Sequence, residues 1–452
     1  MRALRLAAAL LSLGTAPALA DANTLLPAIL EGQAVLPANT LVPPPPDAPP
    51  ALALSGKFTG PGGRRVDEPG KIQGRTSPGP SGRPTGIDLP VKGQPVQGVS
   101  SLRAAADGTV WGLADNGYGA KGNSADALLG LHRFRLDFGG GKAERVETLW
   151  LSDPDRRFPW PITLEGTERR YLTGADIDPE SLVVTPDGFW VSDEFGPFLL
   201  RFDRQGRLQE PVETEVDGKP VRSPDHPALR LPGTPDQPLA FEVGRSRGFE
   251  SLMAGPDGRK LYALMEGPVW KEGTAERWAD GKPRLRWMVY DTVDKRWTGE
   301  GWTYPLEADG NTVAEATWVD ERRALVLERD SGEGDAARAC PAGQPGPTCF
   351  ERPARFKRLY LVTRPPEGAA GAAVAKEGYI DLLAIADPKG LAKQGGAEGR
   401  YGMPFVTIES AALLPDGRVL VANDNNFPFS AGRFLDRADD TEFVVLRVEG
   451  LK

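Results

Sequence analysis

The chain has 452 residues, with 62 acidic and 54 basic side chains and a formal net charge of -8. An acidic chain lacks the basic patch that nucleic-acid binding requires, so we expect no nucleic-acid partner. His132 and His226 are the only two histidines, which argues against a zinc site built from several histidines.

The first twenty residues have the pattern of an export signal. Arg2 and Arg5 precede an apolar run over residues 6–13, and a small-x-small motif ends at Ala20. This run is too short to span a bilayer, and the order of its parts predicts a signal peptide over residues 1–20, cleaved after Ala20. We therefore expect a periplasmic or secreted protein, and no later segment approaches the length of a membrane span.

A proline-rich segment follows the predicted signal peptide. Residues 37–50 read PANTLVPPPPDAPP, a composition typical of an extended, semi-rigid linker. We therefore expect residues 21–50 to be an N-terminal segment and residues 51–452 to form one domain.

Five later segments share one pattern: a short strand that opens with an oxygen-bearing residue, a turn, and a second strand that ends in an acid. Asp-Gly and Pro-Asp-Gly are strong turn signals between such strands. The segments are SSLRAAADGTVWGLAD (100–115), ESLVVTPDGFWVSDE (180–194), ESLMAGPDGRKLYALME (250–266), EATWVDERRALVLE (315–328) and ESAALLPDGRVLVAND (409–424).

In a hairpin centred on each turn, the first and last oxygen-bearing side chains face each other at the open end. Directly opposed residues lie about 5 Å apart, and opposed like charges destabilise a hairpin. The repetition suggests that a cation compensates these charges. The expected pairs are Ser100 with Asp115, Glu180 with Asp193, Glu250 with Glu266, Glu315 with Glu328, and Glu409 with Asp424.

Further strand pairs lie between these hairpins, so each repeat reads as about four antiparallel strands. Such a repeat predicts an all-β fold, a β-propeller, with the acidic hairpin ends at one mouth of its channel. The last strand, 442–448, lacks a partner, and we expect residues 51–58 (ALALSGKF) to pair with it and close the ring. Five hairpins are visible, and residues 60–98 could hide a sixth blade.

The two cysteines and the aromatic residues have structural interpretations. Cys340 and Cys349 flank a Gly/Pro-rich loop, and in an oxidising compartment this spacing favours a local disulfide. Tryptophans recur in the hairpins and are expected in the core between blades. Residues 158–160 (FPW) and 427–429 (FPF) are expected in loops, where they could rim a pocket.

Several stretches resemble the phytase-like family, which carries the description "esterase-like activity of phytase". They are TGADIDPESLVVTPDGFWVSDEFGPFLLRFD (173–203), LADNGYGAKGNSADALL (113–129), GFESLMAGPDG (248–258), EGPVW (266–270) and NDNNFPFSAGR (423–433). The family is similar to the β-propeller alkaline phytases. This resemblance implies six blades, calcium dependence and hydrolysis of an ester, with a phosphate ester as the leading class.

Calcium is the cation that suits these acids, because it takes six to eight oxygen ligands from carboxylates, amides and carbonyls. A pairing of some acids with arginine is the alternative, and 328–330 (ERD) fits it. The candidate metal ligands are Asp115, Asn116, Glu180, Asp193, Glu194, Glu250, Glu266, Glu315, Glu328, Glu409, Asp424 and Asn425.

For phosphate-ester hydrolysis, a metal would activate the attacking water, and Glu180 or Glu250 would accept its proton. Lys121, Arg329 and Arg433 are candidates for binding the anion, and each has a surface ion pair as its alternative. We expect a monomer that acts on a small-molecule ester.

Three other interpretations stay open or are set aside. The same acids could serve a metal-dependent lactonase or another carboxylic-ester hydrolase, which needs no basic anion site. A non-catalytic propeller that binds partners and holds structural calcium is the second alternative. Residues 244–248 (GRSRG) match the G-x-S-x-G nucleophile motif, but a strand-like segment follows and both histidines precede Ser246, so we interpret the match as chance.

Overall fold

Short antiparallel strands joined by tight turns make up most of the protein. The computed structural model describes residues 24–59, 72–76, 82–234, 237–366 and 368–451. The predicted signal peptide lies outside these ranges. No helix in the described part of the chain is long and apolar enough to cross a membrane.

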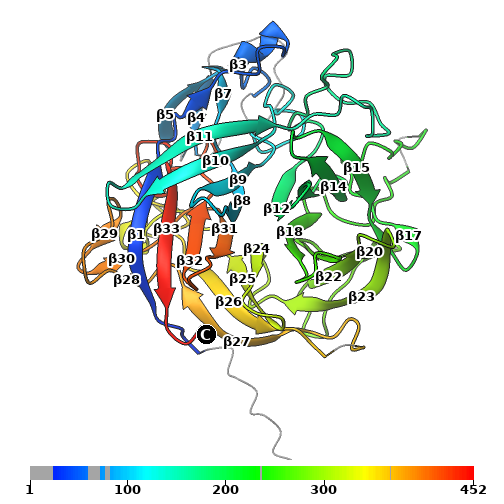
Figure 1. Cartoon of the computed structure of the whole chain (residues 1–452). Coiled ribbons are helices and arrows are strands. Elements are labelled where there is room, and N and C mark those ends of the chain that lie inside the picture. The colour runs from blue at the N-terminus through cyan, green and yellow to red at the C-terminus, as the bar shows by residue number, and fades with distance from the viewer. Residues whose placement is uncertain (1–23, 60–71, 77–81, 235–236, 367, 452) are drawn as a thin grey trace, which may run out of the picture.

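Five groups of four antiparallel strands surround a central axis in a propeller-like arrangement (Figure 1). Three groups are separate sheets, and the first and last are joined through their outer strands in one eleven-stranded sheet. We call each group a blade and give its strands from the inner to the outer. Blade 1 is β8 (Val99–Ala104), β9 (Val110–Ala114), β10 (Gly130–Asp137) and β11 (Lys142–Trp150). Blade 2 is β12 (Pro179–Thr185), β13 (Gly188–Asp193), β14 (Phe198–Asp203) and β15 (Leu208–Glu213). Blade 3 is β18 (Phe249–Ala254), β19 (Lys260–Met265), β22 (Arg284–Asp291) and β23 (Arg296–Pro305).

The last two blades continue this order. Blade 4 is β24 (Thr312–Trp318), β25 (Arg323–Arg329), β26 (Lys357–Thr363) and β27 (Ala375–Asp381). Blade 5 is β31 (Ile408–Leu413), β32 (Val419–Asn423), β33 (Thr441–Val448) and β1 (Ala28–Leu36). The inner strands contact one another in sequence around the axis, and β31 also contacts β8, so the ring of inner strands is closed.

The strand that completes blade 5 is not the one expected. β1 pairs antiparallel with β33 from Ala28↔Val448 to Leu36↔Thr441, whereas residues 51–58 contain a 3-10 turn and the two-residue strand β3 (Leu54–Ser55). The physical reason is that β1 offers nine residues with a largely buried apolar pattern, while prolines start the 3-10 turn. The blades therefore begin before the proline-rich segment, not after it.

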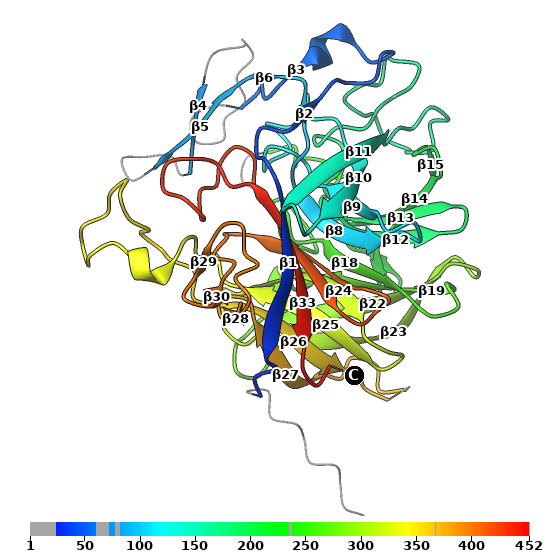
Figure 2. The same ribbon diagram turned by 60° about the vertical axis from the view of Figure 1, so that its left-hand side comes forward.

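Residues 60–98 do not form a sixth blade in their described part. They contribute β4 (Ile72–Arg75), β5 (Pro84–Leu89), β6 (Val91–Lys92) and β7 (Gln94–Pro95). β4 pairs with β5, β6 with β3, and β7 with β2 (Leu41–Val42), as separate two-stranded sheets. Figure 2 shows them as a lobe beside blade 1. Leu89 of this lobe packs with Tyr118 and Phe427. Phe429 of the same loop is half-buried and lines a cavity of about 310 Å³, as expected of a residue at a pocket rim.

The apolar core lies between neighbouring blades, as the tryptophan pattern predicts. Trp190 packs against Tyr290 across blades 2 and 3 with ring centroids 6.1 Å apart. Trp111 lies 5.6 Å from Phe189 across blades 1 and 2. In the residue 158–160 loop, Phe158 is buried, Pro159 is exposed and Trp160 is half-buried. The rings of Phe158 and Trp160 both lie 5.4 Å from Phe198 of blade 2. Large buried aromatic rings of this kind hold the blades in fixed positions.

The expected disulfide is confirmed. Cys340 and Cys349 are bonded, with Cα atoms 4.9 Å apart. The bond closes the loop that follows the short 3-10 helix η2 (Ala336–Arg338).

Candidate metal centre

A β-bulge interrupts each inner hairpin near its open end, and it changes the expected pairing of the acids. In blade 2, Pro179 opposes Asp193 and Ser181 opposes Ser192, so Glu180 is the extra residue between them. Bulges at the same place leave Glu250, Glu409 and Ser100 without a directly opposed residue. None of the five expected pairs is directly opposed in the strand register, because a bulge sets two residues against one. Glu250 and Glu266 nevertheless come together, with carboxylate oxygens within 4.8 Å of each other.

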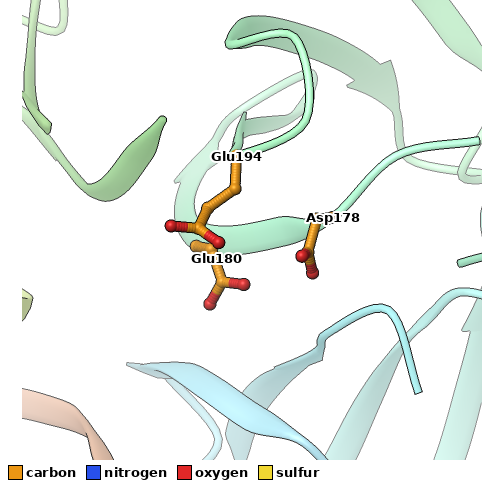
Figure 3. Close-up of side chains that lie close together, drawn as sticks. All are labelled: Asp178, Glu180 and Glu194. Carbon is orange, nitrogen blue, oxygen red and sulfur yellow. The ribbon is translucent and has the colours of Figure 1, made fainter. Parts of the chain in front are cut away.

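The bulges nevertheless gather acids at one mouth of the ring. Asp178, Glu180 and Glu194 have carboxylate oxygens that all lie within 4.8 Å of one another. Figure 3 shows these carboxylates grouped at the start of β12 and the end of β13. Asp178 was not among the predicted ligands, although its position two residues before Glu180 in the sequence DPE could have signalled it.

A second triple overlaps the first through Glu194. Glu194, Glu250 and Glu266 also have oxygens within 4.8 Å of one another, so the two triples form one continuous group across blades 2 and 3. Gly248 makes this approach possible: a Cβ there would lie 2.5 Å from the main-chain oxygen of Glu194. We call these five acids, Asp178, Glu180, Glu194, Glu250 and Glu266, the acid cluster.

Burial makes the acid cluster costly unless a cation is present. Its five side chains belong to residues that are 2% to 8% exposed, and the Glu194 Oε1 atom is buried without a hydrogen-bond partner among the described residues. Buried carboxylates without partners are unfavourable. An orphaned carboxylate oxygen aimed at four other acids is the arrangement expected of a site that takes a hard cation with oxygen ligands.

Three further predicted ligands adjoin the acid cluster through blades 1 and 5. Burial raises the pKa of Asp115 and of Glu409, and raises the pKa of Asp424 well above its usual range, with the Asp115 and Glu409 charges adding to the effect. Gln97 donates to Asp115 at 2.9 Å, and the backbone N–H of Asn426 donates to Asp424 at 2.7 Å. These acids form the far side of the same mouth.

Three predicted ligands have supporting contacts instead. Asn116 donates from Nδ2 to Asp178 at 2.7 Å and thereby orients it. Asp193 accepts from the backbone N–H groups of residues 178 and 196 at 2.7 and 2.6 Å, so it shapes the loop after β13. Asn425 accepts from the backbone N–H of residue 98 at 3.4 Å, which ties blade 5 to blade 1.

The structure places the remaining two predicted ligands outside the acid cluster. In blade 4 the bulge lies between the pairs Val313↔Glu328 and Ala316↔Val326, and it contains Ala314 and Glu315. The bulge turns the Glu315 side chain into the channel. There the Ser181 hydroxyl donates a hydrogen bond to it at 2.9 Å. Glu328 accepts from Lys376 at 2.8 Å inside blade 4. It is thus paired with a cation, but with a lysine and not with an arginine.

The predicted cations have different surroundings. Arg329 is buried and donates to Glu409 at 2.8 Å, so it neutralises one acid at the mouth. Lys121 donates to the backbone oxygen of Asp225 at 2.9 Å, and its charge lowers the pKa of Asp193 against the stronger effect of burial. Arg433 pairs with Glu442 inside blade 5.

Sequence reasoning missed Arg247, the cation that contacts the acid cluster from solvent. Its guanidinium pairs with Glu266, and its side chain is 51% exposed. It lies in the GRSRG segment, whose Ser246 occupies a turn with a φ of 46°. Strand β18 follows that turn, so the segment is not the strand-to-helix elbow of a serine hydrolase. The arginine in this segment, and not its serine, faces the mouth.

The acid cluster predicts an unusual pH dependence for the metal-free protein. Burial raises the pKa of Asp178 to about 8 and raises those of Glu180, Glu194 and Glu250 well above their usual range. A carboxyl group with a higher pKa in the folded state than in the unfolded state makes its full contribution to stability at a pH below the unfolded pKa. That contribution is lost as the pH rises through the folded pKa.

We therefore expect the unfolding free energy in EDTA to fall between about pH 6.5 and 8, by about 1.4 kcal/mol per pH unit for each such group. The window begins at the ordinary histidine pKa of about 6.5, above which the unfolded chain loses its histidine protons and their opposing effect on stability fades. Urea unfolding at several pH values measures the effect. A stability that rises with pH in EDTA would contradict the assignment, and calcium should flatten the profile.

The chain shares sequence with one known protein family and with a curated relative. The sequence pattern of the family described as "Phytase-like: Esterase-like activity of phytase" matches residues 94–427. An "Uncharacterized secreted protein" of Arthroderma benhamiae is 29% identical over 184 residues, which span 36% of this chain and 36% of that protein. The chain thus matches about a third of the length of this curated relative.

Two solved structures share a distant likeness. The PQQ-bound aldose sugar dehydrogenase of Streptomyces coelicolor is 14% identical, with 78% of this chain and 95% of that chain covered and a TM-score of 0.33. A thermostable family-43 glycoside hydrolase is 11% identical, with 78% and 93% covered and a TM-score of 0.33. Scores this low carry no argument about the activity of this chain.

Proposed function

The chain belongs to the phytase-like family, and from this premise we propose that it is an exported, calcium-dependent hydrolase of phosphate esters on a five-bladed propeller. Its predicted signal peptide, its disulfide and a relative described as secreted support export to the periplasm or medium. The family description supports ester hydrolysis.

The observation that carries the proposal is the pair of overlapping carboxylate triples around Glu194. Five buried acids with one orphaned oxygen fit a cation. Their ligand atoms are all oxygen, which suits calcium and disfavours the metals that prefer histidine or cysteine. Asp178, Glu180, Glu194, Glu250 and Glu266 would hold the ion, and Asp424 and Glu409 would complete the negative wall of the mouth.

Each residue of the site has a proposed role in phosphate-ester hydrolysis. A bound calcium would supply Lewis-acid polarisation of the attacking water and of the phosphate oxygens. Glu180 and Glu250 lie in the two triples that share Glu194, and we propose them as the acceptors of the water proton. Arg247, half exposed against Glu266, would bind the phosphate oxygens with its planar guanidinium. Arg329 offsets the charge of Glu409.

Hydrolysis of p-nitrophenyl phosphate by the mature protein tests this function. We expect turnover that needs calcium, that EDTA abolishes, and that Glu180→Ala reduces by at least about 100-fold, the loss typical of a missing proton acceptor. Glu144→Gln is the matched control, because Glu144 is 67% exposed on blade 1 and pairs only with Arg135 at the surface. This variant should keep full activity.

The same experiment separates the alternatives. The Arg247 cation at the mouth favours an anionic ester over a lactone. Turnover of a lactone without turnover of p-nitrophenyl phosphate would favour the lactonase instead. Calcium binding with neither activity would favour a non-catalytic platform with structural calcium.

A further inference from the structure

A cavity with several arginines in its lining lies in the loops of blades 4 and 5, apart from the acid cluster. It has a volume of about 470 Å³, and none of its lining residues is one of the five clustered acids. Its walls are the η2 segment, the strands β29 (Gly396–Ala397) and β30 (Arg400–Tyr401), and the loop at residues 433–434. Figure 2 shows the short helix η2 beside β29 and β30.

Arginine dominates the charge of this cavity. Arg338 and Arg400 line it and are exposed, and neither forms an ion pair with a carboxylate in the described part of the chain. Outside the lining, the Arg437 guanidinium lies 3.6 Å over the ring of Phe434, which is a residue of the cavity wall. The one acid of the lining, Asp335, accepts from the backbone N–H of Ala337 at 2.9 Å and caps η2.

Arg433 forms the buried part of the wall, and the protein itself holds most of its guanidinium. Its Nε and Nη2 atoms bind Glu442 at 2.8 Å, and Nη2 also donates to the Gly402 oxygen at 2.9 Å. The Nη1 edge lies against Gly395, where a Cβ would come within 2.1 Å of Nη1, and the φ of +74° there also favours glycine. The backbone of this glycine therefore packs directly against the guanidinium and fixes its position.

We propose that this cavity binds an oxyanion of charge two or more, such as a phosphoryl group or a polycarboxylate. Guanidinium groups bind such anions with paired, charge-assisted hydrogen bonds. The net charge of the chain is -8, so its overall field repels anions, and a local group of arginines is needed to hold one. Arg433, one of the three residues predicted from the sequence to bind an anion, lines this cavity and does not lie at the metal centre.

Calorimetric titration with inorganic pyrophosphate tests the site. The full-length mature protein is used in EDTA at about 0.15 M ionic strength, where distant charges are screened. We expect saturable binding of one pyrophosphate per chain, weakened at least about tenfold by Arg338→Gln with Arg400→Gln, since each variant side chain loses a charge-assisted hydrogen bond to the anion. A parallel titration with citrate shows whether carboxylates bind as well as phosphoryl groups.

Two control variants make the result specific. Arg135→Gln with Arg447→Gln removes two arginines that are 64% and 52% exposed on other strands, and pyrophosphate should bind it as it binds the wild type. Glu194→Gln should also leave binding unchanged, which separates this site from the metal centre. The proposal is overturned if the wild type shows no saturable binding, if the Arg338/Arg400 variant binds normally, or if Glu194→Gln alters the affinity.

Discussion

Replacing Glu194 by glutamine is expected to remove the stabilisation that calcium gives to this protein and to stabilise the metal-free form. Glu194 is the member shared by both carboxylate triples, so its loss breaks both sets of ligands. In the metal-free protein, burial and the charges of Glu266 and Glu250 raise its pKa well above the usual range. A neutral amide ends that repulsion.

Thermal unfolding with and without calcium measures both effects. At about 100 times its dissociation constant, a ligand stabilises the folded state by about 2.7 kcal/mol, and Glu194→Gln should lose most of this gain. Glu144→Gln should respond to calcium like the wild type, since Glu144 lies at the surface of blade 1. If Glu194→Gln keeps the full calcium response, the acid cluster is not the calcium site.

Replacing Glu315 by alanine is expected to destabilise the fold more than any surface substitution. Glu315 of blade 4 accepts hydrogen bonds in the channel from Ser101 of blade 1, from Ser181 of blade 2 at 2.9 Å and from Ser251 of blade 3 at 3.1 Å. Arg103 pairs with it at 2.9 Å. One carboxylate thus joins four blades, and its removal takes the carboxylate partner from Arg103 and the acceptor from three hydroxyls, at a cost of about 3–5 kcal/mol.

Urea unfolding of three variants checks this role. Glu315→Ala should lower the free energy of unfolding by about 3–5 kcal/mol. Glu315→Gln should lower it by less, because the amide oxygen still accepts hydrogen bonds. Glu144→Ala removes a surface ion pair with Arg135 and should cost less than about 1 kcal/mol. A loss for Glu315→Ala as small as for Glu144→Ala would show that the channel network does not hold the blades together.

The sequence alone was sufficient for the parts of this fold that depend on local signals. The Pro-Asp-Gly turns predicted the inner hairpins, and the disulfide followed from the spacing of Cys340 and Cys349. The alternation of four strands predicted the blades. These features depend on neighbours in the chain, where turn chemistry and strand patterns act directly.

Tertiary structure decided which acids meet. A β-bulge shifts the inner strand by one residue, and a shift of one residue sends a side chain to the other face of a strand. This shift moved Glu315 into the channel. Asp178 reached the acid cluster from before the start of its strand, and Arg247 reached it from a loop of another blade, so no repeat pattern marked either residue.

Tertiary structure also decided which segment completes blade 5. Residues 28–36 and 51–58 both precede the first hairpin, and both are short apolar segments. Only the assembled blades present the free edge of β33, and β1 has the length and the apolar face to cover it. A sequence shows which residues can form a strand. Which distant strand it pairs with depends on which strand edge the rest of the fold leaves unpaired.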